Sequence, residues 1–312
     1  MSGPVTTDDE APAEGGCGDT RRELEVTDPH EARVGRFTVR RALPRRTRRT
    51  VGSWCFVDLM GPAQVTEEHG LDVAPHPHIG LQTVTWLLAG EGLHRDSLGT
   101  EQVIAPGQLN LMTAGRGIAH SEEATGRYAG PLQGVQLWVA QPEETRHGDP
   151  AFEHHGELPQ VELGSTLATV LVGDLAGTAS PARRDTDHLG ADLQVRTGTT
   201  VLPLQRLHEH ALVVVEGSVT VGGTPVSEGQ LAYLGVDHDE VPVEAREPAR
   251  AMLLGGVPLE DRLVMWWNYV ARSQDEVSDA HRAWTAGATD RFGSVASPLE
   301  RLVPDPPPWD RG

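Results

Sequence analysis

Lysine is absent from the sequence. All 26 basic residues are arginines, and 45 acidic residues give the 312-residue chain a net charge of −19 at pH 7. Electrostatic phosphate binding relies on a basic surface, so this balance argues against a nucleic-acid binder and against attraction to an anionic membrane. We therefore expect neither nucleic acid nor membrane among the partners of this protein.

Cysteine and long apolar runs are also scarce. The two cysteines, Cys17 and Cys55, stand in very different surroundings and cannot build a disulfide framework. Residues 1–16 lack the basic start and the apolar stretch of a signal peptide, and no apolar run approaches the roughly 20 residues of a transmembrane helix. We expect a soluble, cytoplasmic protein, in a compartment that keeps thiols reduced and supplies divalent metals.

Glycine and proline, in contrast, are frequent, with 35 and 23 residues. They recur every eight to twelve residues or so around short β-rich runs such as "RFTVRRAL", "LQTVTWLL" and "ALVVVEG". That rhythm is typical of an all-β sandwich or barrel. A chain of this length is expected to form two domains of roughly 100 to 150 residues each.

One helix has clear signals, in "SQDEVSDAHRAWTAG". Ser273 and Glu276 form a capping box, Val277, Ala280 and Trp284 fall on one face, and the following glycine ends the helix.

An internal echo links "LLAGEGLHRD…EQVIAPGQLNLMTA" with "VVEGSVTV…TPVSEGQLAYLG". Such a duplicated β unit predicts two similar barrels in tandem, with a boundary near residues 150–170.

Two histidines, His76 and His78, flank a proline immediately before a strand-like run. Side chains at i and i+2 of an extended chain point to the same side, so both imidazoles can reach one metal ion. The alternative is a surface loop exposed to water. Downstream, His120 and Glu122 repeat the i, i+2 spacing after a glycine-rich turn. Together these residues offer nitrogen and oxygen ligands for Fe(II), Mn(II), Ni(II) or Cu(II), and the lack of thiolate argues against a closed structural zinc site.

Several segments together resemble the pirin family: "PHPHIGLQTVTWLLAGEGLHRDSLGT", "PGQLNLMTAGRGIAHSEE", "LQGVQLWVA" and "FTVRRALPRRTRRTVGSWCFVDLMGP". The resemblance covers roughly residues 35–293, densely in the first half and loosely in the second. It implies a bicupin with one iron site in the N-terminal barrel, held by His76, His78, His120 and Glu122. Fe(II) is then the expected cofactor, with Mn(II), Ni(II), Cu(II) or Zn(II) as alternatives.

The fold class we expect is therefore all-β, two tandem cupin (jelly-roll) barrels with a short C-terminal helix. The segments are a disordered acidic tail (1–30), an N-terminal cupin domain with the metal site (31–165), a C-terminal cupin domain without metal (166–295) and a Pro-rich tail (296–312). His208, His210 and His238 of the second half fall out of register with the ligands of the first half, so we expect no metal there.

Pirins similar to this sequence show quercetinase activity, a 2,3-dioxygenase reaction that opens the flavonol ring and releases carbon monoxide. The resemblance implies a flavonol-like aromatic substrate and O₂, Glu122 as the base that takes the proton of the 3-hydroxyl, and Gln136 facing the pocket. Gln136 stands between apolar neighbours in its strand, so the alternative is that its side chain points to solvent. Ile79 replaces the Arg or other polar residue that often follows the second histidine, which would make the rim less basic.

Pirins also act as non-catalytic regulators, in which the oxidation state of the iron alters a surface that engages a partner protein. The arginine-rich stretch of residues 40–49 is the candidate surface for such a protein partner. A solvated edge strand protected by charge is the alternative interpretation of the same stretch. We expect His94 and Arg95 to be structural, with Asp96 and Ser97 bonding to turn backbone groups. Cys55 is expected to be a core residue.

Overall fold

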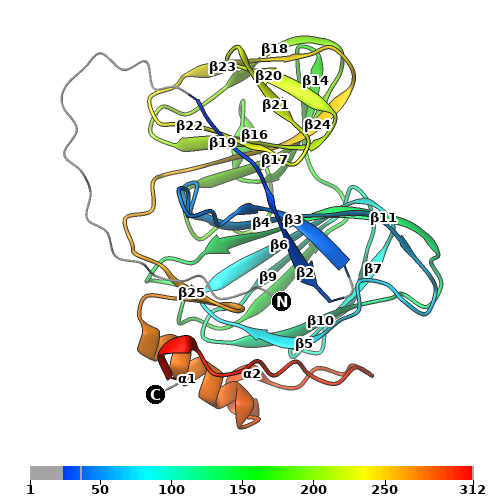
Figure 1. Ribbon diagram of the computed structural model, residues 1–312, viewed down its shortest axis with the longest axis vertical. Helices are drawn as coiled ribbons and strands as arrows, with labels where there is room; N and C mark the ends of the chain where they lie inside the picture. The colour runs from blue at the N-terminus through cyan, green and yellow to red at the C-terminus, as the bar shows by residue number, and fades with distance from the viewer. Residues whose placement is uncertain (1–23, 36, 311–312) are drawn as a thin grey trace.

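The computed structural model of the protein describes residues 24–35 and 37–310. Figure 1 shows two β-barrels stacked along the long axis, with the second barrel at the top and helices α1 (Gln274–Thr285) and α2 (Thr289–Phe292) beneath the first. The predicted all-β architecture of two tandem barrels with a short C-terminal helix is confirmed. Within the described ranges, no helix is both long and apolar enough to cross a bilayer.

The first barrel is built from two antiparallel sheets. The larger sheet has the strand order β12 (Ala151–His155), β9 (Leu109–Thr113), β6 (Leu81–Ala89), β11 (Gly130–Ala140), β4 (Trp54–Val65), β3 (Phe37–Leu43) and β2 (His30–Val34). The smaller sheet has the order β5 (Val73–His78), β10 (Ile118–Glu123), β7 (Gly92–Asp96) and β8 (Glu101–Ile104). The β-branched and aromatic residues of β6 suit a strand buried on both faces, and that strand lies near the middle of the larger sheet.

The second barrel repeats this plan. Its larger sheet runs β1 (Glu25–Thr27), β22 (Leu231–Gly235), β19 (Glu209–Glu216), β24 (Ala249–Gly256), β17 (His188–Val195), β14 (Thr166–Val172) and β13 (Gln160–Leu163). The smaller sheet runs β18 (Gly198–Pro203), β23 (Glu240–Ala245), β20 (Ser218–Val221) and β21 (Thr224–Ser227). A short hairpin of β15 (Asp174–Leu175) and β16 (Thr178–Ala179) lies between β14 and β17 in the sequence. Strands β18 to β24 therefore occupy the places of β5 to β11, as the echo around the two "GQL" segments predicts.

A shared apolar core joins the two barrels. Trp54 of β4 belongs to the same buried cluster as Val213 of β19 and Met252 of β24. The Trp54 indole Nε1 donates to the carbonyls of Leu189 (3.0 Å) and Gly255 (3.2 Å), so its one polar group is satisfied inside the second barrel. The barrels are consequently packed as one core. Cys55 is buried in a separate apolar cluster with Phe56 and Leu81, so it is a core residue, as expected.

The chain beyond the second barrel returns to the first. A hairpin of β25 (Val264–Trp266) and β26 (Tyr269–Ala271), then α1, α2 and the 3₁₀ turn Pro308–Asp310, follow β24. Ser273 caps α1 by accepting the N–H of Glu276, as predicted. The N–H of Leu302 donates to the carbonyl of Pro75 on β5 at 2.8 Å. These contacts differ from the expected layout, which assigned the helix to the second barrel and residues 296–312 to a tail.

The other end of the chain also holds an unexpected strand. Residues 25–27, inside the range 1–30 that we expected to be disordered, form β1 and pair with β22. Pairing with a sheet edge satisfies their backbone groups, which composition alone does not anticipate. Residues 1–23 of that expected tail, Cys17 among them, lie outside the described residues.

The arginine-rich stretch of residues 40–49 serves the contact between barrels. Arg40 pairs with Glu228 at 2.7 Å, and Arg48 pairs with Glu25 at 2.6 Å. Arg48 also stacks on the Tyr233 ring at 3.5 Å. These guanidinium groups are therefore engaged within the chain.

Candidate metal centre

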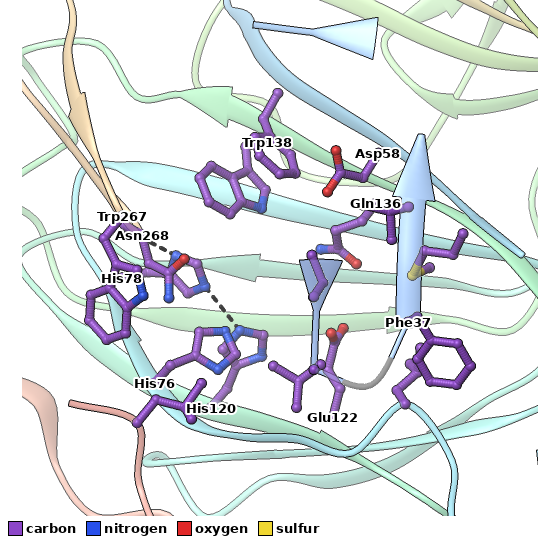
Figure 2. Close-up of a pocket in the computed structure, with 18 residues that line it drawn as sticks. Phe37, Asp58, His76, His78, His120, Glu122, Gln136, Trp138, Trp267 and Asn268 are labelled. Carbon is purple, nitrogen blue, oxygen red and sulfur yellow. Dashed lines mark hydrogen bonds between the residues drawn. The ribbon is translucent and has the colours of Figure 1, made fainter. Parts of the chain in front are cut away.

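Three imidazoles meet between the neighbouring strands β5 and β10. His76 lies directly opposite His120 in the antiparallel register, and the i, i+2 spacing turns His78 to the same side. All three are buried, and one ring nitrogen from each lies within 4.8 Å of the others. Figure 2 shows the rings converging, with the Nε2 atoms of His78 and His120 3.0 Å apart. Gly115 permits the tight turn before β10, since it has a φ of +53° and a Cβ there would lie 2.2 Å from a carbonyl oxygen.

Backbone carbonyls orient two of these rings. The Nδ1 of His76 lies 2.9 Å from the carbonyl oxygen of Ala74, and the Nδ1 of His78 lies 3.0 Å from that of Asn268. A carbonyl can only accept, so both rings carry their proton on Nδ1 and present the Nε2 lone pair to the cluster. Ligating histidines are commonly fixed in this way by the partner of their other nitrogen.

A buried carboxylate orients the third ring through another histidine. His94 Nε2 lies 3.2 Å from Asp96 Oδ2, and His94 Nδ1 lies 3.4 Å from Nδ1 of His120. If the Nε2–H of neutral His94 donates a hydrogen bond to Asp96, then His94 Nδ1 is free to accept the Nδ1–H of His120. The second carboxylate oxygen of Asp96 accepts the N–H groups of Leu98 and Thr100, which holds it in place.

Sequence reasoning missed this chain of hydrogen bonds. Asp96 does bond to turn backbone groups, as expected, but it also reaches the site through His94. The available signal was their i, i+2 spacing, because β7 pairs with β10 and places Asp96 opposite His120. Only the pairing of strands makes that spacing meaningful.

The residues present fit a divalent metal ion. Burial lowers the pKa of His76 to about 4 and the pKa values of His78 and His120 well below their usual range, so the rings are neutral at pH 7. If each ring carries its proton on Nδ1, the Nε2 atoms of His78 and His120, 3.0 Å apart, turn their lone pairs toward one another and repel. A cation shared by the rings removes that repulsion, and neutral imidazole suits Fe, Mn, Ni, Cu and Zn ions.

Glu122 faces the same cavity from β10. Its carboxylate is half-buried, and burial among the apolar walls raises its pKa. The Oγ1 of Thr85 lies 3.5 Å from Glu122 Oε1 and 3.0 Å from Gln136 Oε1, so all three polar groups meet on one wall. A bulge between His120 and Glu122 separates the carboxylate from the tight group of three nitrogens. Its role as a fourth ligand stays a prediction.

The cavity beside the histidines is narrow and mostly apolar. Its lining includes the three histidines, Glu122, Gln136 and a series of apolar side chains: Phe37, Val39, Phe56, Met60, Leu71, Val73, Trp138 and Leu302. Phe56 and Trp138 stack with ring centroids 4.0 Å apart, and both line the cavity. Asp58 also lines the cavity, but Arg41 binds both of its oxygens at 2.7 Å and balances its charge. Such a space suits a flat aromatic ligand with a few polar groups.

Ile79 does not belong to this lining. It is buried in an aromatic cluster with Trp266, Tyr269 and Trp284, behind the histidines. The expectation that Ile79 makes the rim of the pocket less basic was therefore wrong. Strand parity turns the residue after His78 away from the metal site.

Family models agree with this fold. The model described as Pirin matches residues 36–139, and the model described as Pirin C-terminal cupin domain matches residues 190–293. A Pseudomonas aeruginosa protein named "Putative quercetin 2,3-dioxygenase" is 46% identical over 280 residues, covering 88% of this chain and 87% of that protein. The chain belongs to the pirin family. The expected fold of two tandem cupin barrels is thereby confirmed.

Solved structures of pirins and related proteins superimpose on the chain. The crystal structure of a quercetin 2,3-dioxygenase from Acinetobacter baumannii is 38% identical, with a TM-score of 0.88 over 91% of this chain and 96% of that one. A bacterial pirin from Escherichia coli in complex with nickel(II) is 18% identical, with a TM-score of 0.61 over 76% of this chain and 100% of that one. At that identity, the second similarity concerns the pirin fold alone.

Proposed function

We propose that this pirin is a metal-dependent dioxygenase of the quercetin 2,3-dioxygenase type, acting on a flavonol-like substrate with O₂. The observation that carries the proposal is the three-histidine cluster beside a mostly apolar cavity with aromatic side chains in its lining, which also holds Glu122. The relatives named for quercetin 2,3-dioxygenase activity support it. When bound, a divalent ion, Fe(II) by our proposal, would supply Lewis acidity and a route for electrons from the flavonol to O₂.

The metal would be held by His76, His78 and His120, with Glu122 as the proposed fourth ligand. Glu122 would also accept the proton of the flavonol 3-hydroxyl. A half-buried carboxylate with a raised pKa is suited to that transfer. In the overall reaction, both atoms of O₂ enter the products, the central ring opens and carbon monoxide leaves.

Gln136 would orient the substrate. Its side chain lies on the same wall as Glu122, and its Oε1 accepts a hydrogen bond from the Thr85 hydroxyl. The amide N–H groups of Gln136 can then donate to a substrate oxygen. The stacked pair of Phe56 and Trp138 would bind the aromatic rings and exclude water.

Oxygen uptake and carbon monoxide release by Fe(II)-loaded protein with quercetin test the proposal. Glu122→Gln should lower kcat by about 100-fold or more. Glu123→Gln is the matched control, because Glu123 bonds to Ser121 and Arg95 and does not line the cavity. Metal analysis of both variants separates a lost base from a lost ligand.

A negative result has a clear meaning. Stoichiometric metal with no oxygen uptake across a panel of flavonols and catechols would sink the enzyme proposal. The non-catalytic redox regulator would then stand, although Arg40 and Arg48 of its proposed partner surface pair with acidic residues of the same chain.

A further inference from the structure

The β25–β26 hairpin carries a tryptophan in an unusual backbone conformation. Trp266 pairs with Tyr269, so Trp267 and Asn268 form a two-residue turn. Trp267 has a φ of +53°, in the left-handed region that favours glycine and that bulky residues rarely adopt. A position of this kind in a two-residue hairpin is commonly filled by Gly, Asn or Asp. A bulky residue held there is a reason to look for a function of its side chain.

The tip of this hairpin reaches the metal cavity of the first barrel. Trp267 and Asn268 both line it, and Trp267 is only 7% exposed. Figure 2 shows both residues beside His78, on the side of the cavity opposite Phe37. The carbonyl of Asn268 is the acceptor that fixes the His78 ring. One turn therefore orients a proposed ligand and supplies an aromatic wall.

Packing on both sides holds the turn in place. The N–H of Val270 donates to the carbonyl of Ile79 at 3.2 Å, and a Cβ on Gly80 would lie 2.2 Å from the Val270 oxygen, so the hairpin sits tightly against the end of β5. Behind it, the Trp266 ring meets the His281 ring of α1 edge-on, with centroids 5.4 Å apart. The position of the indole of Trp267 is thus set by the hairpin and helix that follow the second barrel.

We propose that Trp267 is the ligand-selecting residue of the cavity. Its indole forms the wall against which one ring of a planar aromatic ligand packs, and it limits the size of the ligand on that side. The choice of flavonols as the ligand class rests on the proposed function. The wall itself follows from the hairpin geometry and is tested without turnover.

Trp267→Gly is the main variant, because glycine adopts the left-handed φ readily and preserves the turn. Trp266→Ala is the matched control, since it removes an indole from the same hairpin and the same aromatic cluster but not from the cavity lining. Trp267→Asn, which also tolerates this backbone conformation, serves if the glycine variant fails to fold.

Anaerobic titration of quercetin into Fe(II)-loaded protein measures binding in the absence of turnover. We expect Trp267→Gly to keep its metal but to raise the Kd for quercetin about tenfold, and to lower the preference for quercetin over a bulkier quercetin glycoside by about the same factor. EDTA should extract the metal faster from Trp267→Gly than from Trp266→Ala, since the opened wall admits the chelator.

The outcomes separate the two proposals. If the unaltered protein takes up no oxygen but Trp267→Gly changes flavonol binding, the dioxygenase proposal is refuted and the proposed role of Trp267 is supported. Turnover with an unchanged Kd and unchanged ligand preference in Trp267→Gly would refute the role of Trp267 alone. If no flavonol binds, equal rates of EDTA extraction from Trp267→Gly and Trp266→Ala would overturn it as well.

Discussion

The two barrels share one strand plan but place their histidine pairs on different strands. In the first barrel, His76 and His78 lie on β5, opposite β10. In the second barrel, His208 and His210 lie just before and within β19, which is the counterpart of β6 rather than of β5. The same "His-x-His" spacing therefore has different surroundings, because strand position decides which side chains meet.

The counterparts of the ligand strands are mostly apolar. On β18, Thr200 and Leu202 are buried where β5 carries its histidines, and on β23 the buried residues are Val241, Val243 and Ala245. His208 instead lies 3.2 Å from Asp187. The comparison teaches that a duplicated barrel keeps its architecture through its core while the chemistry of each copy depends on a few inward positions.

The largest expected effect is the loss of metal from the first barrel alone. His78→Ala should lower metal affinity by about 100-fold or more and abolish oxygen uptake, because it removes one of three converging nitrogens. His210→Ala should leave metal content unchanged. Metal analysis after dialysis checks both variants, and equal losses would show that the two barrels are less different than the structure indicates.

A smaller effect is expected from the carboxylate behind His94. Asp96→Asn keeps an oxygen for the turn N–H groups but replaces the acceptor of His94 Nε2, so metal affinity should fall about 10- to 100-fold. Asp187→Asn, next to His208, is the equivalent change in the second barrel and should leave affinity unaltered. Competition with a fluorescent chelator measures both affinities. If Asp96→Asn binds metal with wild-type affinity, the role of Asp96 in orienting His94 is refuted.

Acid should destabilise the second barrel through its buried histidines. Burial lowers the pKa values of His188 and His210 to about 4. Below pH 6.5 the unfolded chain binds protons that the folded chain excludes, so stability is full above pH 6.5 and is lost as pH falls toward 4. Each histidine should cost about 2 kcal/mol between pH 7 and pH 5.

Urea unfolding at pH 7 and pH 5 measures this loss. The variant His188→Gln should lose about 2 kcal/mol less than the unaltered protein over the same interval, because glutamine does not titrate. An identical pH dependence in the two proteins would contradict the assignment of His188 as a neutral packing group.

The smallest effect concerns the residue after His78. Ile79→Val should cost about 1 kcal/mol of stability, as a lost buried methyl group does, and should leave the KM for quercetin unchanged. Phe37→Leu, which changes the cavity lining, should raise that KM instead. Thermal unfolding and steady-state kinetics distinguish the two variants. A change of KM in Ile79→Val would show that Ile79 does affect the substrate pocket.

Much of the fold and the central site could be predicted from the sequence. Turn residues at regular spacing indicated the strands, the "GQL" echo indicated the duplication, and Ser273 indicated the start of α1. The i, i+2 pairs ending in His78 and Glu122 identified the cavity-facing residues, because side-chain direction in a strand alternates with every residue. These properties are local or repeat along the chain, so they can be predicted from the sequence without a structure.

Tertiary structure alone decided what lies around that site. The sequence by itself determined two barrels, three converging histidines and a nearby carboxylate. Folding decided that β7 brings His94 behind His120, that Ile79 turns away, and that the chain beyond the second barrel returns to place Trp267 in the first cavity. Those contacts join residues far apart in the chain, and no local pattern encodes them because they depend on which strands pair and which surfaces pack.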